Sequence, residues 1–323
     1  MTRFNPNRRT LLKAAAAAPA LALPAPLLAQ VSGPAGRSNP PYFRFDVGTA
    51  RITVVSDGYL GLGVDGLATN ASLDEIVAFL EAHRLSTEQN YSHTNHVVIQ
   101  TGEATVLVDV GSGNRFLPTA GRLMDNLNAA GIDPSTITHV VITHAHPDHI
   151  WGVRDGFDEP ILPDAEYIIG AAEHDWWMQD GLVDRVPAEM QQFVVGAVNS
   201  LTTEGLEWTR LRDGDAVVPG VRLIDTPGHT PNHMSVMIES AGKRLLALGD
   251  AMTHAYVSVE RPGWHGGFDY DGPTAVETRK RLLDMAATDA IPVLGYHFPF
   301  PGVGNIMRDG DGYRFVPAIW NWG

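Results

Sequence analysis

Residues 142–152 read ITHAHPDHIWG. Three histidines and one aspartate, His144, His146, Asp148 and His149, fall within six positions and follow the β-branched run THVVIT. Residues two apart on an extended segment face the same side, so His144 and His146 can bind one ion together. The intervening proline turns the chain, so Asp148 and His149 can address a second ion beside the first. Imidazole and carboxylate groups are ligands for zinc and similar divalent metals.

Three more candidate ligands follow later apolar runs. IDTPGHTPNH places His229 after a Pro-Gly turn, whereas LLALGDA and VLGYHFPF place Asp250 and His297 at strand ends. Seven candidates are enough for two three-ligand sites that share one carboxylate, and each site then keeps a position for water. A chance cluster of surface polar residues is disfavoured, because four of the seven candidates fall within six consecutive residues. The nearby His233 is assigned a structural role.

The ordered motifs THAHPDH, GHT, GDA and GYH resemble those of the metallo-β-lactamase superfamily. LVDVG resembles the early aspartate motif of that superfamily, with Asp109 in its place. The resemblance covers roughly residues 43–317. It implies an α/β fold, the αββα sandwich, in which two mixed β-sheets are flanked by helices.

The resemblance also implies a ligand assignment and a reaction. Asp250 would bridge two divalent ions, most simply Zn²⁺ with Mn²⁺, Co²⁺ or Fe²⁺ as alternatives. A hydroxide between the ions would attack an ester, a lactone or a phosphotriester. Asp109 would orient ligands without binding metal. Site one would comprise His144, His146 and His229, and site two Asp148, His149 and His297.

Specific resemblances suggest which residues contact the substrate. GHTPNH and the stretch HFPFPGVGNIMRDGDGYRFVP resemble methyl parathion hydrolase and the related quorum-quenching lactonases. Members of that branch bind aromatic or apolar substrates near the metals, so Trp176, Trp177 and Phe298 are predicted to bind substrate. Core packing of the Trp pair is equally compatible with the sequence.

Catalytic roles are predicted for Asp148 and Asp250, and two residues after Asp250 are further candidates. His254 and Tyr256 could stabilise a developing oxyanion or protonate a leaving group. By contrast, we expect His93 and His96 to be turn and edge residues ahead of a strand.

Apolar periodicity and turn residues predict the secondary structure. A hairpin is expected at residues 43–58 and two strands at 96–111. The expected helices are 72–83, 120–132, 171–181, 187–201 and 274–287. Further strands are expected at 138–144, 165–170, 221–226, 233–240, 244–250, 290–297 and 312–317.

The first 29 residues have the composition of an export signal. They contain an Arg8–Arg9 pair, which an Ala/Leu-rich segment follows. This layout is typical of a twin-arginine signal. Three prolines argue against a membrane span. We therefore predict an export signal at 1–29, a linker at 30–42, a hydrolase domain at 43–323 and a periplasmic location without stable membrane insertion.

Charge and composition narrow the partners. The net charge is −14, and the predicted signal holds four basic and no acidic residues, so its removal leaves −18. Such a charge repels nucleic acid and favours a small neutral or apolar substrate. The chain has no cysteine, which excludes thiolate ligands and disulfides. Many relatives are dimers, so a homodimer is the candidate assembly.

Two other functions fit the same residues. One is an iron-dependent oxygenase of the same superfamily, because His and Asp ligands also suit iron. The other is a non-catalytic metal-binding protein. Seven ligands shared by two ions leave water positions open, unlike a closed structural site, and this favours a hydrolase.

Overall fold

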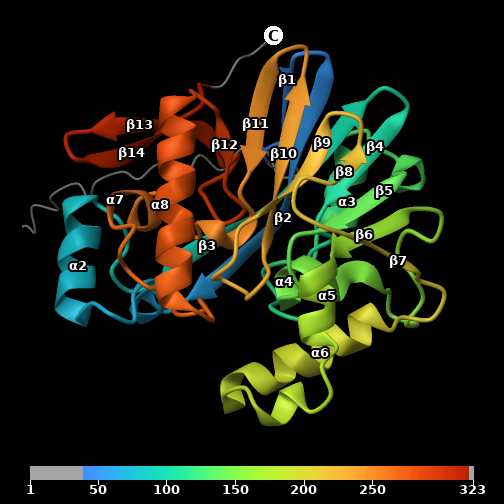
Figure 1. Cartoon of the computed structure of the whole chain (residues 1–323), viewed down its shortest axis with the longest axis horizontal. Coiled ribbons are helices and arrows are strands. Elements are labelled where there is room, and N and C mark those ends of the chain that lie inside the picture. Colours follow the sequence, from blue (N-terminus) through green and yellow to red (C-terminus); the bar gives the residue numbers. More distant parts are fainter. Residues whose placement is uncertain (1–38, 320–323) are drawn as a thin grey trace, which may run out of the picture. The chain divides into compact units, whose positions relative to one another are not determined.

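Two seven-stranded β-sheets form the centre of the fold, in a computed structural model that describes residues 39–319 (Figure 1). The first sheet has the order β1-β2-β3-β4-β5-β6-β7 and the second β14-β13-β12-β11-β10-β9-β8. The first-sheet strands are β1 (Tyr42–Val47), β2 (Ala50–Leu62), β3 (Asn90–Thr101), β4 (Ala104–Val108), β5 (His139–Ile142), β6 (Glu166–Gly170) and β7 (Trp208–Leu211). The second-sheet strands are β8 (Ala216–Val218), β9 (Val221–Asp225), β10 (Met234–Ser240), β11 (Lys243–Ala247), β12 (Val293–Leu294), β13 (Val303–Asp309) and β14 (Gly312–Pro317).

Both sheets are mixed. In the first, β1 to β4 pair antiparallel and β4 to β7 pair parallel. In the second, only the β11–β12 pair is parallel. The parallel strands β5 and β6 are apolar and buried after their first residue, because both of their faces are covered. In β5, for example, Val141 faces the opposite sheet whereas Val140 and Ile142 face helices.

Helices cover the two outer faces (Figure 1). They are α2 (Leu73–Ala82), α3 (Leu123–Ala129), α4 (Pro147–Ile150), α5 (Ala171–Trp177), α6 (Gln191–Leu201), α7 (Val257–Glu260) and α8 (Gly272–Thr288). Residues of α3, α5 and α6 pack on the first sheet, and residues of α8 pack on the second. A third apolar cluster fills the space between the sheets. The predicted αββα sandwich is confirmed.

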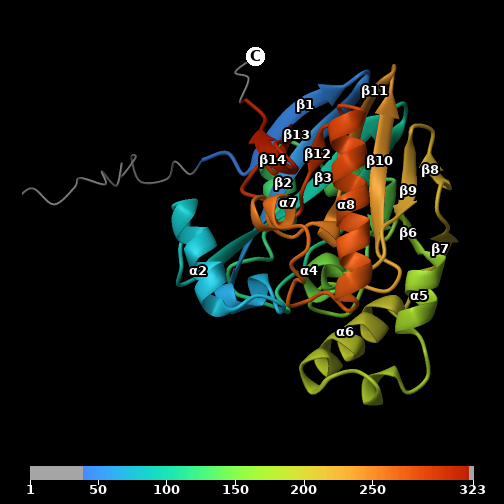
Figure 2. The ribbon, with the colours of Figure 1, turned by 60° about the vertical axis from the view of Figure 1, so that its left-hand side comes forward.

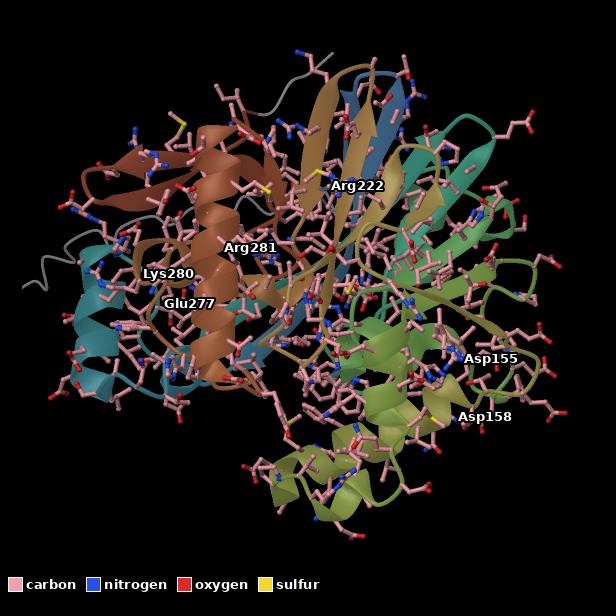
Figure 3. All side chains as sticks on the ribbon, in the orientation of Figure 1. Asp155, Asp158, Arg222, Glu277, Lys280 and Arg281 are labelled. Carbon is pink, nitrogen blue, oxygen red and sulfur yellow. The ribbon has the colours of Figure 1, made fainter. Side chains whose placement is uncertain are left out.

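Helix α8 illustrates how sequence sets an element. Asp271 caps its start by accepting from Thr274 N, and a proline follows within the first turn. Leu282 and Leu283 are buried against the second sheet. Glu277 and Lys280, labelled in Figure 3, form an exposed ion pair, so the helix presents a charged outer side. Figure 2 shows the ribbon of α8 from a second side.

The described chain departs from the predicted elements in several places. Strand β2 continues to Leu62 and β3 begins at Asn90, so both are longer than expected. The prediction that His93 and His96 precede a strand is wrong, because both lie within β3 and the His96 side chain is buried. Strands β7, β8 and β13 were not predicted. The predicted export signal and most of the linker lie outside the described residues. No helix within residues 39–319 is long and apolar enough to cross a membrane.

Candidate metal centre

Four strand ends bring the seven candidate ligands together. The segment between β5 and α4 carries His144 and His146, and α4 itself carries Asp148 and His149. The turns after β9, β11 and β12 supply the rest. All seven are buried, and three groups have ligand atoms within 4.8 Å of one another. These groups are His144, His146 and His229; His144, His149 and Asp250; and Asp148, His149 and His297.

Asp250 lies between the two predicted sites. One carboxylate oxygen, Oδ1, is 3.5 Å from His149 Nε2. The other, Oδ2, is 3.2 Å from His229 Nε2 and 3.1 Å from His297 Nε2. Burial raises the pKa of Asp250, but the surrounding histidines outweigh this and hold it well below its usual range. Asp250 therefore stays ionised and can bridge two cations.

The hydrogen bonds of His229 fix which ring nitrogen is free. Its Nδ1 lies 3.3 Å from Asp269 Oδ1, and an ionised carboxylate can only accept. The proton is therefore on Nδ1, and Nε2 keeps its lone pair. That Nε2 faces His146 Nδ1 at 2.9 Å, so the two nitrogens point toward the same space.

In the second predicted site, the Nδ1 atoms of His149 and His297 are also hydrogen-bonded. His149 Nδ1 donates to Asp109 Oδ2 at 2.8 Å, and His297 Nδ1 donates to the His93 carbonyl at 2.7 Å. In both rings Nε2 is left facing carboxylates of the cluster. His297 Nε2, for instance, is 3.4 Å from Asp148 Oδ2. In each ring the hydrogen bond of Nδ1 thus directs Nε2 toward the cluster.

Unpartnered buried atoms test whether cations fit. Four atoms of the cluster have no hydrogen-bond partner within the described residues: His144 Nε2, Asp148 Oδ2, His149 Nε2 and Asp250 Oδ1. Buried polar atoms of this kind are normally satisfied. Burial, then neighbouring histidines, also lowers the pKa of His144 and His146, which keeps both rings neutral and able to bind metal. The donors present therefore fit two divalent cations.

Asp109 orients the cluster through hydrogen bonds to Thr143 and the candidate ligand His149. It has a positive φ of 58°, a backbone conformation that non-glycine residues adopt at a cost. Its Oδ1 accepts from Thr143 N at 2.8 Å, and its Oδ2 accepts from Thr143 Oγ1 at 2.9 Å. Because Oδ2 also receives His149 Nδ1, Asp109 joins the end of β5 to α4. This placement agrees with the orienting role expected from the sequence.

Glu173 is a buried acid that the sequence did not mark. Its carboxylate accepts from Trp177 Nε1 at 2.6 Å, from Thr230 Oγ1 at 2.8 Å and from Ala145 N at 3.3 Å. Burial raises its pKa, and the three hydrogen bonds oppose that rise. Ala145 and Thr230 are sequence neighbours of candidate ligands, so Glu173 links two ligand-bearing segments.

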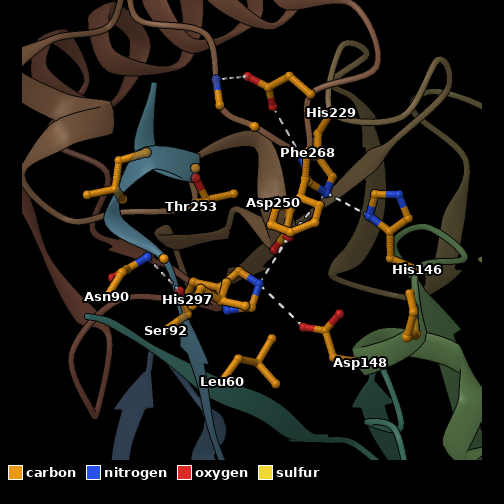
Figure 4. Close-up of a pocket in the computed structure, with 18 of the residues that line it drawn as sticks. Leu60, Asn90, Ser92, His146, Asp148, His229, Asp250, Thr253, Phe268 and His297 are labelled. Atoms are coloured by element: carbon orange, nitrogen blue, oxygen red, sulfur yellow. Dashed lines mark hydrogen bonds and ion pairs between the residues drawn. The ribbon is translucent and has the colours of Figure 1, made fainter. Parts of the chain in front are cut away.

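A pocket leads to the cluster (Figure 4). Its polar floor includes His146, Asp148, Asp250 and His297. Asn90, Ser92 and Thr253 add uncharged polar groups. Its apolar walls come from segments far apart in sequence, and they include Leu60, Leu62, Leu67, Phe116, Phe193 and Phe268.

The Metallo-beta-lactamase superfamily profile matches residues 91–297, more than half of the chain. The chain belongs to this superfamily. It is a metallohydrolase of the superfamily, and the matched region runs from β3 to the candidate ligand His297.

Curated relatives in the superfamily include lactonases. An N-acyl homoserine lactonase of a Bacillus species is 27% identical over 209 residues, covering 58% of this chain and 74% of the relative. One from Bacillus thuringiensis is 24% identical over 210 residues with the same coverage. An atrochrysone carboxyl ACP thioesterase of Passalora fulva is 30% identical over 163 residues, covering 50% of this chain and 39% of the relative.

Solved structures share the superfamily fold. A dizinc quorum-quenching lactonase in complex with a product aligns with a TM-score of 0.81 and 23% identity, over 88% of this chain and 100% of that one. A hydrolase in the beta lactamase superfamily aligns with a TM-score of 0.82 and 24% identity over the same shares. At these identities the similarity establishes the fold.

Within this superfamily fold, two predicted substrate-binding residues lie in the core instead. The Phe298 ring is fully buried and packs against Phe315 at 5.0 Å between centroids. Trp177 is also fully buried, with its ring behind His146 at 5.8 Å. Consecutive helical residues point about 100° apart, so only Trp176 is partly exposed, and it packs against Tyr270. These placements contradict direct substrate contact by Phe298 and Trp177, and none of the three lines the pocket.

The predicted catalytic residues His254 and Tyr256 likewise do not line the pocket. His254 Nδ1 accepts from the backbone N–H groups of Tyr256 at 3.2 Å and Val257 at 3.1 Å, so it caps the start of α7. Tyr256 packs in apolar clusters, with its ring 5.7 Å from that of His83. Their sequence proximity to Asp250 was misleading, because the chain turns away after Thr253.

Proposed function

We propose that this superfamily member is a dinuclear metal-dependent hydrolase that opens lactones or cleaves carboxylic esters bearing an apolar group. The observation that carries this proposal is the pocket, in which apolar walls end on the seven-residue cluster. When bound there, two divalent ions, most simply Zn²⁺, would lower the pKa of a water shared between them and polarise the carbonyl.

The lining of the pocket favours a neutral substrate. No lysine or arginine is among its lining residues, whereas Asp148, Asp250 and Asp269 are. A phosphate monoester or diester would meet no positive side chain there. The names of the curated relatives, lactonases and a thioesterase, support attack at an acyl carbonyl rather than at phosphorus.

Different side chains around the pocket would bind the substrate and position the reacting groups. Phe116, Phe193 and Phe268 provide the surface for an apolar acyl or aryl group. Asn90 Nδ2 donates to Ser92 Oγ at 3.1 Å, which leaves the Ser92 hydroxyl proton for a substrate oxygen. Asp250 would contribute to both ligand sets, because its Oδ1 lies near His149 and its Oδ2 lies near both His229 and His297.

A side-by-side assay tests this function. The purified protein, loaded with Zn²⁺, is given N-acyl homoserine lactones of two chain lengths, an aryl ester and a methyl phosphotriester. Asp250→Asn, with its metal content measured, serves as the blank. We expect turnover of the lactone or ester and a loss of about 10³-fold or more in the variant.

Two outcomes would contradict the proposal. Turnover of the phosphotriester well above the other substrates would reassign the reaction to phosphorus. Inactivity on all four substrates, with two ions bound per chain, would favour the non-catalytic or the oxygenase alternative.

We also propose export to the periplasm, on the basis of the Arg8–Arg9 pair and the Ala/Leu-rich segment of residues 1–29. Cell fractionation of the full-length chain tests this directly. Replacement of both arginines by lysine should retain the protein in the cytoplasm, and unchanged periplasmic recovery would overturn the route.

A further inference from the structure

Asp269 contacts the candidate ligand His229 and also lines the pocket. Its Oδ1 is 3.3 Å from His229 Nδ1. Its Oδ2 accepts from Gly266 N at 2.7 Å and from Arg279 Nη2 at 3.1 Å. The side chains of Asp269 and Arg279 are 1% and 3% exposed, so this ion pair is shielded from water. Removal of one partner from a buried ion pair is strongly destabilising, because it leaves an uncompensated buried charge.

The residue before Asp269 is the wall residue Phe268. Phe268 is 44% exposed and lines the pocket, but it belongs to none of the apolar clusters. Its position therefore depends on how its neighbours are held. Gly267 N donates to the Gly66 carbonyl at 2.8 Å, and Tyr270 N donates to the His229 carbonyl at 3.0 Å. Polar contacts thus hold the segment 263–271 on both sides of Phe268, in addition to the ring contacts of Trp264 and Tyr270.

Arg279 secures the start of this segment from α8. Its Nη1 donates to the carbonyls of Pro262 at 3.1 Å and Trp264 at 2.7 Å, while its Nη2 reaches Asp269. A purely structural acid needs only this arginine and the Gly266 N–H. Asp269 directs its other oxygen at the ring of a candidate ligand instead.

We propose that Asp269 is a positioning residue that couples cation binding by His144, His146 and His229 to the placement of the Phe268 wall. This inference rests on the proposed metal function. Asp269 fixes the proton on His229 Nδ1 and so presents Nε2 to the cation. In return, a cation bound at Nε2 would draw electron density from the ring and strengthen the hydrogen bond from Nδ1 to Asp269. Such linkage is reciprocal. Cation binding would therefore stabilise the ordered conformation of the segment, and that conformation would raise the affinity for the cation.

The test compares two single-charge variants on the same segment. Asp269→Asn removes the charge and one of the two accepting oxygens. Asparagine can accept from His229 or from Gly266 and Arg279, but not from both sides at once. Asp271→Asn is the matched control: it removes the same charge two residues away, and asparagine caps a helix as well as aspartate does. For each protein, metal affinity is measured by chelator competition. Hydrogen exchange of residues 263–271 is measured with and without Zn²⁺.

We expect Zn²⁺ to slow exchange of residues 263–271 in the wild type and in Asp271→Asn. In Asp269→Asn this metal-dependent slowing should disappear, and one of the two ions should bind about 10- to 100-fold more weakly. The second ion should keep its affinity.

Wild-type affinity for both ions in Asp269→Asn would overturn the inference. The inference would also be overturned if Zn²⁺ did not change the hydrogen exchange of residues 263–271 in the wild type. This measurement needs no variant, so it holds even if Asp269→Asn fails to fold. Neither readout uses substrate. If only the proposed hydrolase activity fails, turnover is absent while Zn²⁺ still slows hydrogen exchange of residues 263–271. If only this inference fails, turnover is present while Zn²⁺ leaves that exchange unchanged.

Discussion

The indole Nε1 of Trp177 lies 2.6 Å from the carboxylate of Glu173, deep behind the candidate metal centre. The same ring meets His146 in an edge-on contact. Glu173 also accepts from Thr230, the neighbour of His229. One buried acid thus connects the first ligand motif to the GHT motif, although it contacts neither metal-facing nitrogen.

Glu173→Ala is expected to destabilise the protein. It leaves three donors, on Trp177, Thr230 and Ala145, without their acceptor. An unsatisfied buried donor costs about 1–3 kcal/mol, so the free energy of unfolding should fall by about 3 kcal/mol or more. Guanidinium unfolding in the presence of a chelator measures this. The exposed Glu189→Ala variant should change it by less than about 0.5 kcal/mol, and equal losses in the two variants would refute the prediction.

Removal of metal should lower the melting temperature. The cluster contains buried nitrogens and carboxylate oxygens without hydrogen-bond partners in the described chain, and cations would satisfy them. Zinc at 1,000 times its dissociation constant stabilises the folded state by about 4 kcal/mol if the unfolded chain does not bind it. Calorimetry with EDTA, then with Zn²⁺ restored, should show this loss and its recovery. A melting temperature indifferent to both additions would argue against a metal centre.

Phe268 and Phe298 should respond in opposite ways to alanine. Phe268 lines the pocket and is 44% exposed, so Phe268→Ala should raise KM for apolar substrates by about tenfold with little loss of stability. Phe298 is fully buried, so Phe298→Ala should cost about 3–5 kcal/mol and leave KM unchanged in the folded fraction. Steady-state kinetics and guanidinium unfolding of both variants decide this. The converse pattern would restore Phe298 as a substrate contact.

His254 should contribute to the pH dependence of stability. Burial, and then His83, lowers its pKa from 6.5 to about 4 in the folded state. Above pH 6.5 the ring is neutral in both the folded and the unfolded chain, and its protonation costs no stability. As the pH falls toward 4, only the unfolded chain takes up the proton, and this lowers the free energy of unfolding. At pH 5 the loss is about 2 kcal/mol. Asn in place of His254 retains an acceptor without titrating.

The free energy of unfolding, measured with chelator at pH 7 and pH 5, should therefore fall less in His254→Asn than in the wild type. The difference between the two proteins should be about 2 kcal/mol. Other buried histidines such as His96 affect both proteins equally and cancel. Equal pH slopes would place the His254 pKa near its ordinary value.

The sequence predicted those features that a local pattern records. Each candidate ligand follows an apolar strand and a turn, and the ends of such strands meet at one edge of the sandwich. The pocket wall had no such signal, since Leu60, Phe116 and Phe268 come from unrelated segments and meet only through packing. Sequence neighbourhood was a poor guide to side-chain direction, as His254 and Phe298 show. Asp269 was not predicted because its partner His229 lies forty residues earlier in the sequence.

The distribution of the ligands over both sheets also bears on the order of folding. His144 and His146 follow β5 of the first sheet, whereas Asp250 and His297 follow strands of the second. No half of the chain can bind the metal pair by itself, and a nascent chain lacks its last ligand until residue 297 has been made. Uptake of the full metal complement would thus be a late event in biogenesis. Metal stoichiometry would then distinguish mature molecules from chains that stopped short.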